Sequence, residues 1–134
     1  MPIEQITPRE AKTRLDAGPG TVYLDVRTTQ EFAAGHAPGA VNVPVALMDP
    51  ARGGMAPNPG FLAAVQSRFG PDQKLVVGCA AGGRSQRACE ILQHSGFTAL
   101  SNIRGGFSGM RDPSGRMIEN GWTQEGFPVE TGGA

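Results

Sequence analysis

Two short runs of apolar residues constrain the fold more than any other feature of this sequence. They are VYLDV (Val22–Val26) and KLVVG (Lys74–Gly78), and their length and composition are typical of buried strands. Both runs lie between segments that carry helix signals. Strands that alternate with helices are joined by crossover connections, which favour a mainly parallel sheet with helices on both faces. The sequence therefore predicts an α/β fold.

Capping boxes mark the start of two helices. TPRE (Thr7–Glu10) and TTQE (Thr28–Glu31) each place a threonine three residues before a glutamate, and we expect their helices to end near Gly18 and Gly35. The other expected elements are a short strand in Ala40–Pro44, a loop at Met48–Pro59, a helix after Asn58-Pro59, a helix from near Ser85 to Gly96, a strand in Thr98–Ile103 and a closing helical turn in Gly121–Glu130.

The composition fits one domain and excludes several classes of partner. The 134 residues are expected to form a single domain, residues 1–134, and 12 basic residues balance 12 acidic ones, so neither nucleic acid nor a membrane surface is an expected partner. The longest apolar runs fall far short of the roughly 18 residues that span a bilayer, and no secretory signal is expected. The scattered cysteines and histidines, two of each, indicate reduced thiols in the cytoplasm, with no metal site and no cofactor.

The strand KLVVG is followed by a loop with almost no side chains. The stretch CAAGGRS begins at Cys79, and its alanines and glycines can offer a ligand only their backbone N–H groups. Binding sites form at the carboxyl ends of parallel strands, and N–H groups that converge at the start of a helix stabilise an anion. The nearest atom that can become an anion is the sulfur of Cys79, and Arg84 adds a positive charge. We therefore expect Cys79 to be reactive.

The alternative for any cysteine after a strand is a structural role in the core. For Cys79 the flanking Ala-Ala-Gly-Gly-Arg stretch favours reactivity instead. Cys89 differs, because it shares a helical face with Ala88 and Leu92, so we expect it to pack in the core.

Cysteine phosphatases also cradle a thiolate, in the pattern cysteine, five residues, arginine. Only four residues separate Cys79 from Arg84, and a ring that is one residue short suits a single sulfur better than a phosphate group. A phosphatase also needs a general acid for the leaving alcohol, and the sequence offers no obvious one, with Asp49 or Asp112 as the alternatives left open.

Several segments together resemble the single-domain rhodanese, or thiosulfate sulfurtransferase, family. They are YLDVRTTQEFAAGHAPGAVNVP, LVVGCAAGGRSQRACEILQHSGF, the pair Gly105-Gly106 and GWTQEGFPVE, and they run in the expected order from about Ile3 to Val129. The resemblance implies a five-stranded parallel sheet flanked by helices. It also implies a six-residue loop, Cys79 to Arg84, that holds a persulfide.

The resemblance further implies a two-step reaction with Cys79 as the catalytic residue. Its thiolate takes the outer sulfur of thiosulfate, or of a related sulfane-sulfur donor, and sulfite leaves; an acceptor then takes that sulfur. The implied acceptors are cyanide in an assay and a thiol or a sulfur-acceptor protein in a cell. The Arg84 side chain is expected to attract the sulfonate, with pairing to a carboxylate as the alternative. The implied substrate-binding groups are the N–H groups of Ala80, Ala81, Gly82, Gly83, Arg84 and Ser85.

Other matching residues are interpreted as scaffold. Asp25 and Arg27 are supporting residues, expected to brace the cysteine loop by ionic hydrogen bonds, while Glu31 serves its capping box and His36 ties down a loop. Mercaptopyruvate-type relatives carry a Cys-Gly-Ser-Gly loop, which this chain lacks.

The sequence departs from the family after the Gly-Gly pair. Single-domain relatives carry a tryptophan a few residues later, whereas here an insert at about 107–121 precedes Trp122. RDPSGR within it predicts the turn of a small hairpin. The insert is expected to be a surface excursion; alternatively, Arg111 and Arg116 overhang the pocket and select the substrate. The Met48–Pro59 loop poses the same choice.

Three functions stay open at this point. The first is a sulfurtransferase that works through a Cys79 persulfide. The second is a persulfide carrier that passes sulfur between partner proteins, and the third is a phosphatase or arsenate reductase of the related fold.

Overall fold

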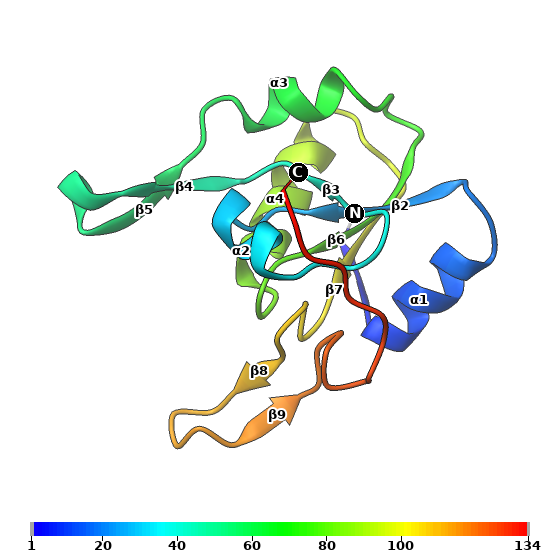
Figure 1. Cartoon of the computed structure of the whole chain (residues 1–134). Coiled ribbons are helices and arrows are strands. Elements are labelled where there is room, and N and C mark those ends of the chain that lie inside the picture. Colours follow the sequence, from blue (N-terminus) through cyan, green and yellow to red (C-terminus); the bar gives the residue numbers. More distant parts are fainter. Residues whose placement is uncertain (1, 134) are drawn as a thin grey trace.

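A parallel sheet of five strands forms the centre of the structure, a computed structural model that describes residues 2–133 (Figure 1). The strand order is β1-β7-β6-β2-β3, and every neighbouring pair is parallel. The predicted sheet is thus confirmed, including its number of strands. The strands are β1 (Glu4–Ile6), β2 (Thr21–Asp25), β3 (Val41–Asn42), β6 (Lys74–Gly78) and β7 (Leu100–Ile103).

Four α-helices connect these strands, and the capping boxes begin two of them as predicted. The Thr7 hydroxyl accepts a hydrogen bond from the Glu10 N–H, while the Glu10 carboxylate accepts one from the Thr7 N–H. Thr28 and Glu31 repeat this reciprocal pair. The helices are α1 (Pro8–Asp16), α2 (Thr29–Ala34), α3 (Phe61–Gln66) and α4 (Gly83–His94).

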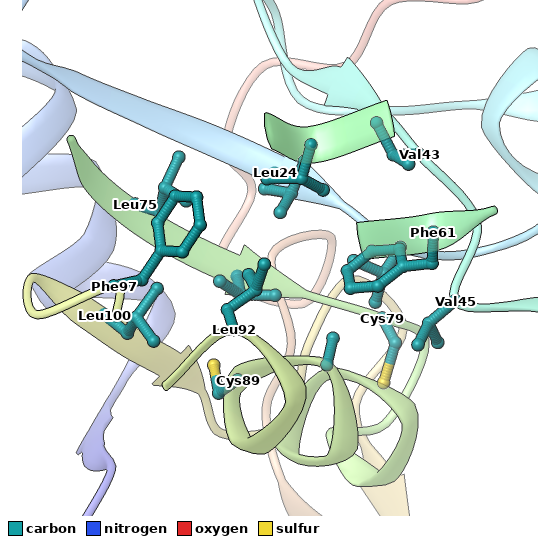
Figure 2. Packing of buried hydrophobic residues seen from close by; sticks show 14 residues of the cluster. Leu24, Val43, Val45, Phe61, Leu75, Cys79, Cys89, Leu92, Phe97 and Leu100 are labelled. Carbon is teal, nitrogen blue, oxygen red and sulfur yellow. The ribbon is translucent and has the colours of Figure 1, made fainter. Parts of the chain in front are cut away.

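The core has two parts, one on each face of the sheet. Successive residues of a strand point to opposite faces, so Leu24 packs with Phe61 of α3 and Leu92 of α4, whereas Tyr23 packs with Trp122 and α1. Figure 2 shows the first part, with α4 lying along the sheet. Burial of a side chain the size of leucine or phenylalanine stabilises the fold by roughly 1.5–3 kcal/mol. Helices therefore cover both faces, as the sequence predicts.

One expectation about local structure is corrected, and one strand was not predicted. The Met48–Pro59 stretch is not a plain loop: β4 (Ala46–Asp49), the 3-10 turn η1 (Pro50–Arg52) and β5 (Gly54–Pro57) make an antiparallel hairpin that projects from the body of the molecule (Figure 1). Strand β1, at the sheet edge, has no apolar run and was not expected. The closing segment contains the expected single helical turn, in which the Glu125 N–H donates to the Gly121 carbonyl at 3.3 Å, and Gly126 ends it with a left-handed φ of 76°.

The insert after the Gly-Gly pair is the expected hairpin, formed by β8 (Met110–Arg111) and β9 (Met117–Glu119). Its turn is held by the Asp112 carboxylate, which accepts hydrogen bonds from Ser114 and from the Arg116 N–H; these bonds lower the pKa of Asp112. At the base of the hairpin, the backbone N–H of Trp122 donates a hydrogen bond to the Gly106 carbonyl. The insert thus returns the chain to the Gly-Gly pair, so Trp122 lies beside it in space although not in sequence.

Candidate active site

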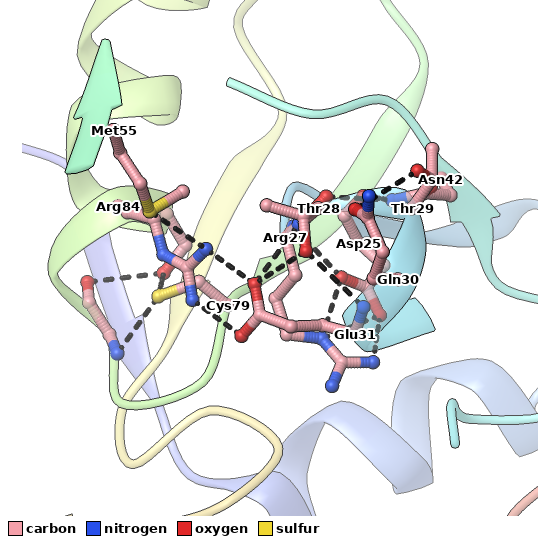
Figure 3. A network of polar contacts seen from close by, with 12 residues as sticks. Asp25, Arg27, Thr28, Thr29, Gln30, Glu31, Asn42, Met55, Cys79 and Arg84 are labelled. Carbon is pink, nitrogen blue, oxygen red and sulfur yellow. Dashed lines mark hydrogen bonds and ion pairs between the residues drawn. The ribbon is translucent and has the colours of Figure 1, made fainter. Parts of the chain in front are cut away.

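Cys79 lies directly after β6 and just before α4, at the carboxyl edge of the sheet. Only 2% of the surface of Cys79 is exposed to solvent, and its thiol forms no disulfide bond. The sulfur accepts a hydrogen bond from the Gly82 N–H at 3.0 Å, and the Ser85 Oγ lies 3.4 Å away (Figure 3). The strand, the loop and the first turn of α4 therefore meet at this sulfur, as the sequence predicts.

The loop offers more N–H groups than its own residues use. Gly82, with a left-handed φ of 124°, turns the chain so that its N–H faces the sulfur. Among residues 2–133, no group accepts a hydrogen bond from the backbone N–H groups of five residues of this stretch, which are Ala80, Ala81, Gly83, Arg84 and Ser85. The last three of these belong to the first turn of α4, where a helix has unpaired N–H groups and a partial positive charge. The site is therefore suited to an anion on or next to the sulfur.

The back of the loop is fixed by the residues after β7. The Phe107 N–H donates to the Cys79 carbonyl at 2.8 Å, and the Ser108 N–H donates to the Ala80 carbonyl at 2.9 Å. Gly106 approaches so closely that a Cβ there would collide with both of these carbonyl oxygens. Gly106, the second glycine of the Gly-Gly pair, thus packs directly against the cysteine loop.

Arg84 is held in an ion pair, which was the alternative interpretation of this residue. Its Nη1 and Nη2 donate to the two carboxylate oxygens of Glu31 at 2.7 and 2.9 Å, and the Met55 sulfur of the β4–β5 hairpin lies 4.0 Å from Nη1 (Figure 3). The Arg84 hydrogen bonds, helped by those from Thr28 and opposed by burial, lower the pKa of Glu31 to about 2. Glu31 therefore serves two purposes, since it caps α2 and orients Arg84.

The ion pair between Glu31 and Arg84 makes part of the stability of the protein depend on pH. Because the folded state lowers the pKa of Glu31, its contribution to stability is complete above the ordinary glutamate pKa and is lost as the pH falls toward 2. We expect Glu31→Gln to reduce the free energy of unfolding at pH 7 by about 1–2 kcal/mol, since the cap is weakened and a partly exposed pair is lost. Urea denaturation at pH 7 and pH 3 measures this. A difference between parent and variant that is as large at pH 3 as at pH 7 would contradict the assignment.

Asp25 and Arg27 form a buried, double hydrogen-bonded ion pair, with contacts of 2.7 to 3.1 Å. No hydrogen bond joins the side chains of this pair to the cysteine loop, which corrects the expectation of bracing by ionic hydrogen bonds. Arg27 instead donates to the Gly35 carbonyl at 2.7 Å and lies over the Phe107 ring at 4.3 Å. Because the Phe107 N–H holds the Cys79 carbonyl, the support is indirect.

Two further residues have the expected structural roles. Cys89 is fully buried in the core, where burial raises the pKa of its thiol to about 12. His36 hydrogen-bonds the Phe32 carbonyl at 2.8 Å through Nδ1 and stacks on the Phe32 ring, and its backbone pairs with Glu130. His36 therefore ties the end of α2 to the tail of the chain.

A cavity of about 450 Å³ lies between the cysteine loop and the β8–β9 hairpin. Met110 and Glu119 of the hairpin line it, whereas Arg111 and Arg116 do not, and the Arg111 side chain donates to the Gly115 carbonyl at 2.9 Å. The suggestion that these arginines overhang the pocket is therefore not supported. The other lining residues are Gln5, Ala81, Gly82, Gly83, Gln86, Asn102, Arg104 and Gly105.

Sequence reasoning missed three contributors to this site, namely Phe107, Asn102 and Gln5. None of them belongs to a motif, and each reaches the site only through the pairing of β1 with β7 or the turn that follows β7. Among residues 2–133, no group of three or more histidine, cysteine, aspartate or glutamate side chains could hold a metal ion. No helix in the same part of the chain is long and apolar enough to cross a membrane.

Known proteins resemble this chain in sequence and in structure. The family described as Rhodanese-like domain matches residues 7–112. Thiosulfate sulfurtransferase 16, chloroplastic, of Arabidopsis thaliana is 43% identical over 111 residues, which cover 83% of this chain and 81% of that protein. Protein HIGH ARSENIC CONTENT 1, mitochondrial, also of Arabidopsis thaliana, is 43% identical over 93 residues, or 69% of this chain and 54% of that protein. The crystal structure of Rv0390 from M. tuberculosis has a TM-score of 0.81 at 29% identity and covers 98% of this chain and 100% of its own.

Proposed function

Because this chain belongs to the rhodanese-like domain family of sulfurtransferases, we propose that it moves sulfane sulfur from thiosulfate, or a related donor, to a thiophilic acceptor through a persulfide on Cys79. One observation carries the proposal: the sulfur of Cys79 accepts a hydrogen bond at 3.0 Å from the N–H of Gly82, the residue directly before α4, and the neighbouring loop N–H groups are left for an anion. Such groups stabilise an anion without any side-chain charge.

The reaction has two steps. In the first, the Cys79 thiolate attacks the outer sulfur of thiosulfate; the new S–S bond forms as the sulfur–sulfur bond of thiosulfate breaks, and sulfite leaves with the electron pair. In the second, a thiolate or cyanide attacks the terminal sulfur, and the Cys79 thiolate leaves. No general base is needed once the thiolate is present. The persulfide anion would lie among the N–H groups of residues 80–85.

The part played by Arg84 follows from its ion pair. Glu31 accepts one hydrogen bond from each terminal nitrogen of the guanidinium and offsets its charge, so in this proposal the Arg84 backbone N–H binds the anion. The guanidinium has further N–H groups, but its attraction for a sulfonate would be weakened while it is paired with Glu31. The acceptor would be a thiol or a sulfur-acceptor protein, and the location would be the cytoplasm, in keeping with two free thiols.

Intact-protein mass after incubation with thiosulfate tests the proposal. The reduced parent chain is expected to gain about 32 Da, the mass of one sulfur atom bound as a persulfide. The Cys79→Ser variant should gain nothing. A parent thiol that alkylates normally but gains no mass with thiosulfate would overturn the thiosulfate reaction.

The same samples distinguish the other candidates. A carrier would form the persulfide but turn over slowly with thiosulfate and a small thiol. The relative named for arsenic content also makes arsenate a worthwhile substrate. Arsenate reduction that depends on Cys79, without a mass gain from thiosulfate, would favour that function over sulfur transfer.

A further inference from the structure

A row of polar side chains leads from Cys79 to the surface. It begins with the Ser85 hydroxyl, which lies 3.4 Å from the Cys79 sulfur and is hydrogen-bonded to the Asn102 Oδ1. Both Ser85 and Asn102 are buried. Asn102 Nδ2 then donates to Gln5 at 2.8 Å, Gln5 Nε2 donates to Gln86 at 2.6 Å, and Gln86 Nε2 donates to Glu90 at 3.3 Å. Every hydrogen bond in the row runs in one direction, away from the sulfur.

This direction limits what Ser85 can do for the sulfur. A hydroxyl has one proton, and the Ser85 Oγ has three neighbours: the Cys79 sulfur, the Gly82 carbonyl at 3.1 Å and the Asn102 Oδ1. The two oxygens can only accept. While Ser85 donates to Asn102, it can accept a hydrogen bond from a neutral thiol, but it cannot donate to a sulfur anion.

A sulfur anion therefore requires the row to change. If Ser85 turned its proton to the sulfur, its oxygen and the Asn102 Oδ1 would face each other, buried and with no proton between them, which is costly. Rotation of the Asn102 amide by half a turn removes this conflict, because Nδ2 then donates to Ser85. The same reversal of Gln5 and Gln86 would keep the Asn102–Gln5 and Gln5–Gln86 hydrogen bonds but lose the one to Glu90. Glu90, which can only accept when ionised, favours the present direction.

We propose that Asn102 is a positioning residue for Cys79: the orientation of its amide decides whether Ser85 donates to Asn102 or to the sulfur anion. For the thiolate this stands on the geometry alone; for the persulfide it rests on the proposed function. Asn102 lies on β7, which pairs with β6, the strand directly before Cys79, and its hydrogen bond on this side goes to Ser85, so it acts through Ser85.

The rate of Cys79 alkylation by iodoacetamide on the reduced full chain tests the proposal, because this rate follows the amount of thiolate. Asn102→Asp replaces the amide by a carboxylate, which can only accept, so the Ser85 hydroxyl continues to donate to residue 102 and not to the sulfur. The alkylation rate at pH 7 is therefore expected to fall about tenfold, and the pH profile of alkylation is expected to move to higher pH. Gln5→Leu, at an exposed position, releases Asn102 from its present orientation. This variant is expected to alkylate about two to three times faster than the parent.

A double-mutant cycle separates this role from general damage. In a Ser85→Ala background, Asn102→Asp should slow alkylation by at most about threefold, because its route through the hydroxyl is gone. Ser101→Ala is the matched control, since Ser101 precedes Asn102 on β7 and is also buried but hydrogen-bonds Glu4 at 2.6 Å; its rate should equal that of the parent. The ion pairs of Arg84 and Arg27 are unchanged in all these variants.

Two results would overturn the proposal: equal slowing by Asn102→Asp with and without Ser85, or no acceleration in Gln5→Leu. The outcome is independent of the proposed function, because alkylation needs no sulfur donor. If the parent forms no persulfide while the alkylation rates follow the expected pattern, the sulfur-transfer reaction fails and the positioning role of Asn102 stands.

Discussion

Cys79→Ser is expected to reduce steady-state sulfur transfer from thiosulfate by at least about a thousandfold, which corresponds to roughly 4 kcal/mol of activation free energy. The reason is chemical, since a serine hydroxyl is not ionised near neutral pH and cannot form the S–S bond that stores the transferred sulfur. The surrounding structure should be preserved, because the two side chains have nearly the same shape. Sulfite release measured over time gives the rate, and circular dichroism checks the fold.

The second cysteine provides the control for this variant. Cys89 lies in the core with its thiol pKa raised to about 12 by burial, so it stays a neutral thiol during turnover. Cys89→Ala should therefore keep the rate within about twofold, while the small cavity it leaves lowers the free energy of unfolding by about 1–2 kcal/mol. A Cys89→Ala rate as low as that of Cys79→Ser would show that the two thiols act together, contrary to the mechanism.

The parts of the fold that could be predicted are those specified by local chemistry. Thr7 and Thr28 each form a reciprocal cap with a residue three positions later, and the KLVVG strand has the residue range expected from its apolar run. Strand β1 could not be predicted, because EQI has no strand pattern and pairs with β7 only after the chain has passed through three other strands of the sheet. The β4–β5 hairpin could not be predicted either, because its glycines and prolines are typical of loops.

The candidate site likewise has a part that could be predicted from the sequence and a part that could not. Cys79, its N–H groups and the start of α4 are consecutive in sequence, so a single stretch of residues indicates them. The partner of Arg84 lies 53 residues away, and the Ser85 hydroxyl reaches Asn102 on another strand. Such contacts depend on the register of the sheet and on which helix covers it, and no local pattern encodes either. The indirect support from Asp25 and Arg27 was misjudged for the same reason.

Gly106→Ala is expected to lower both the free energy of unfolding and the rate of persulfide formation, because Gly106 has a left-handed backbone conformation and is tightly packed. Its φ of 53° costs a residue with a Cβ about 1–2 kcal/mol. The new Cβ would also collide with the carbonyl oxygens of Cys79 and Ala80, which belong to the backbone and cannot move aside without moving the loop. We expect a loss of about 3 kcal/mol or more in the free energy of unfolding, and at least a tenfold fall in persulfide formation as the loop N–H groups are displaced.

Gly115→Ala separates the two causes. Gly115, in the turn of the β8–β9 hairpin, has a φ of 89°, but a Cβ there would meet no atom within 4 Å. It should therefore show only the backbone strain, about 1–2 kcal/mol by urea denaturation, and form the persulfide at the parental rate. The difference between the two alanine variants measures how much the cysteine loop depends on contact with the Gly-Gly pair. If Gly106→Ala behaves like Gly115→Ala in both measurements, the loop is held by its hydrogen bonds to Phe107 and Ser108 alone, and the close packing of Gly106 contributes nothing to the site.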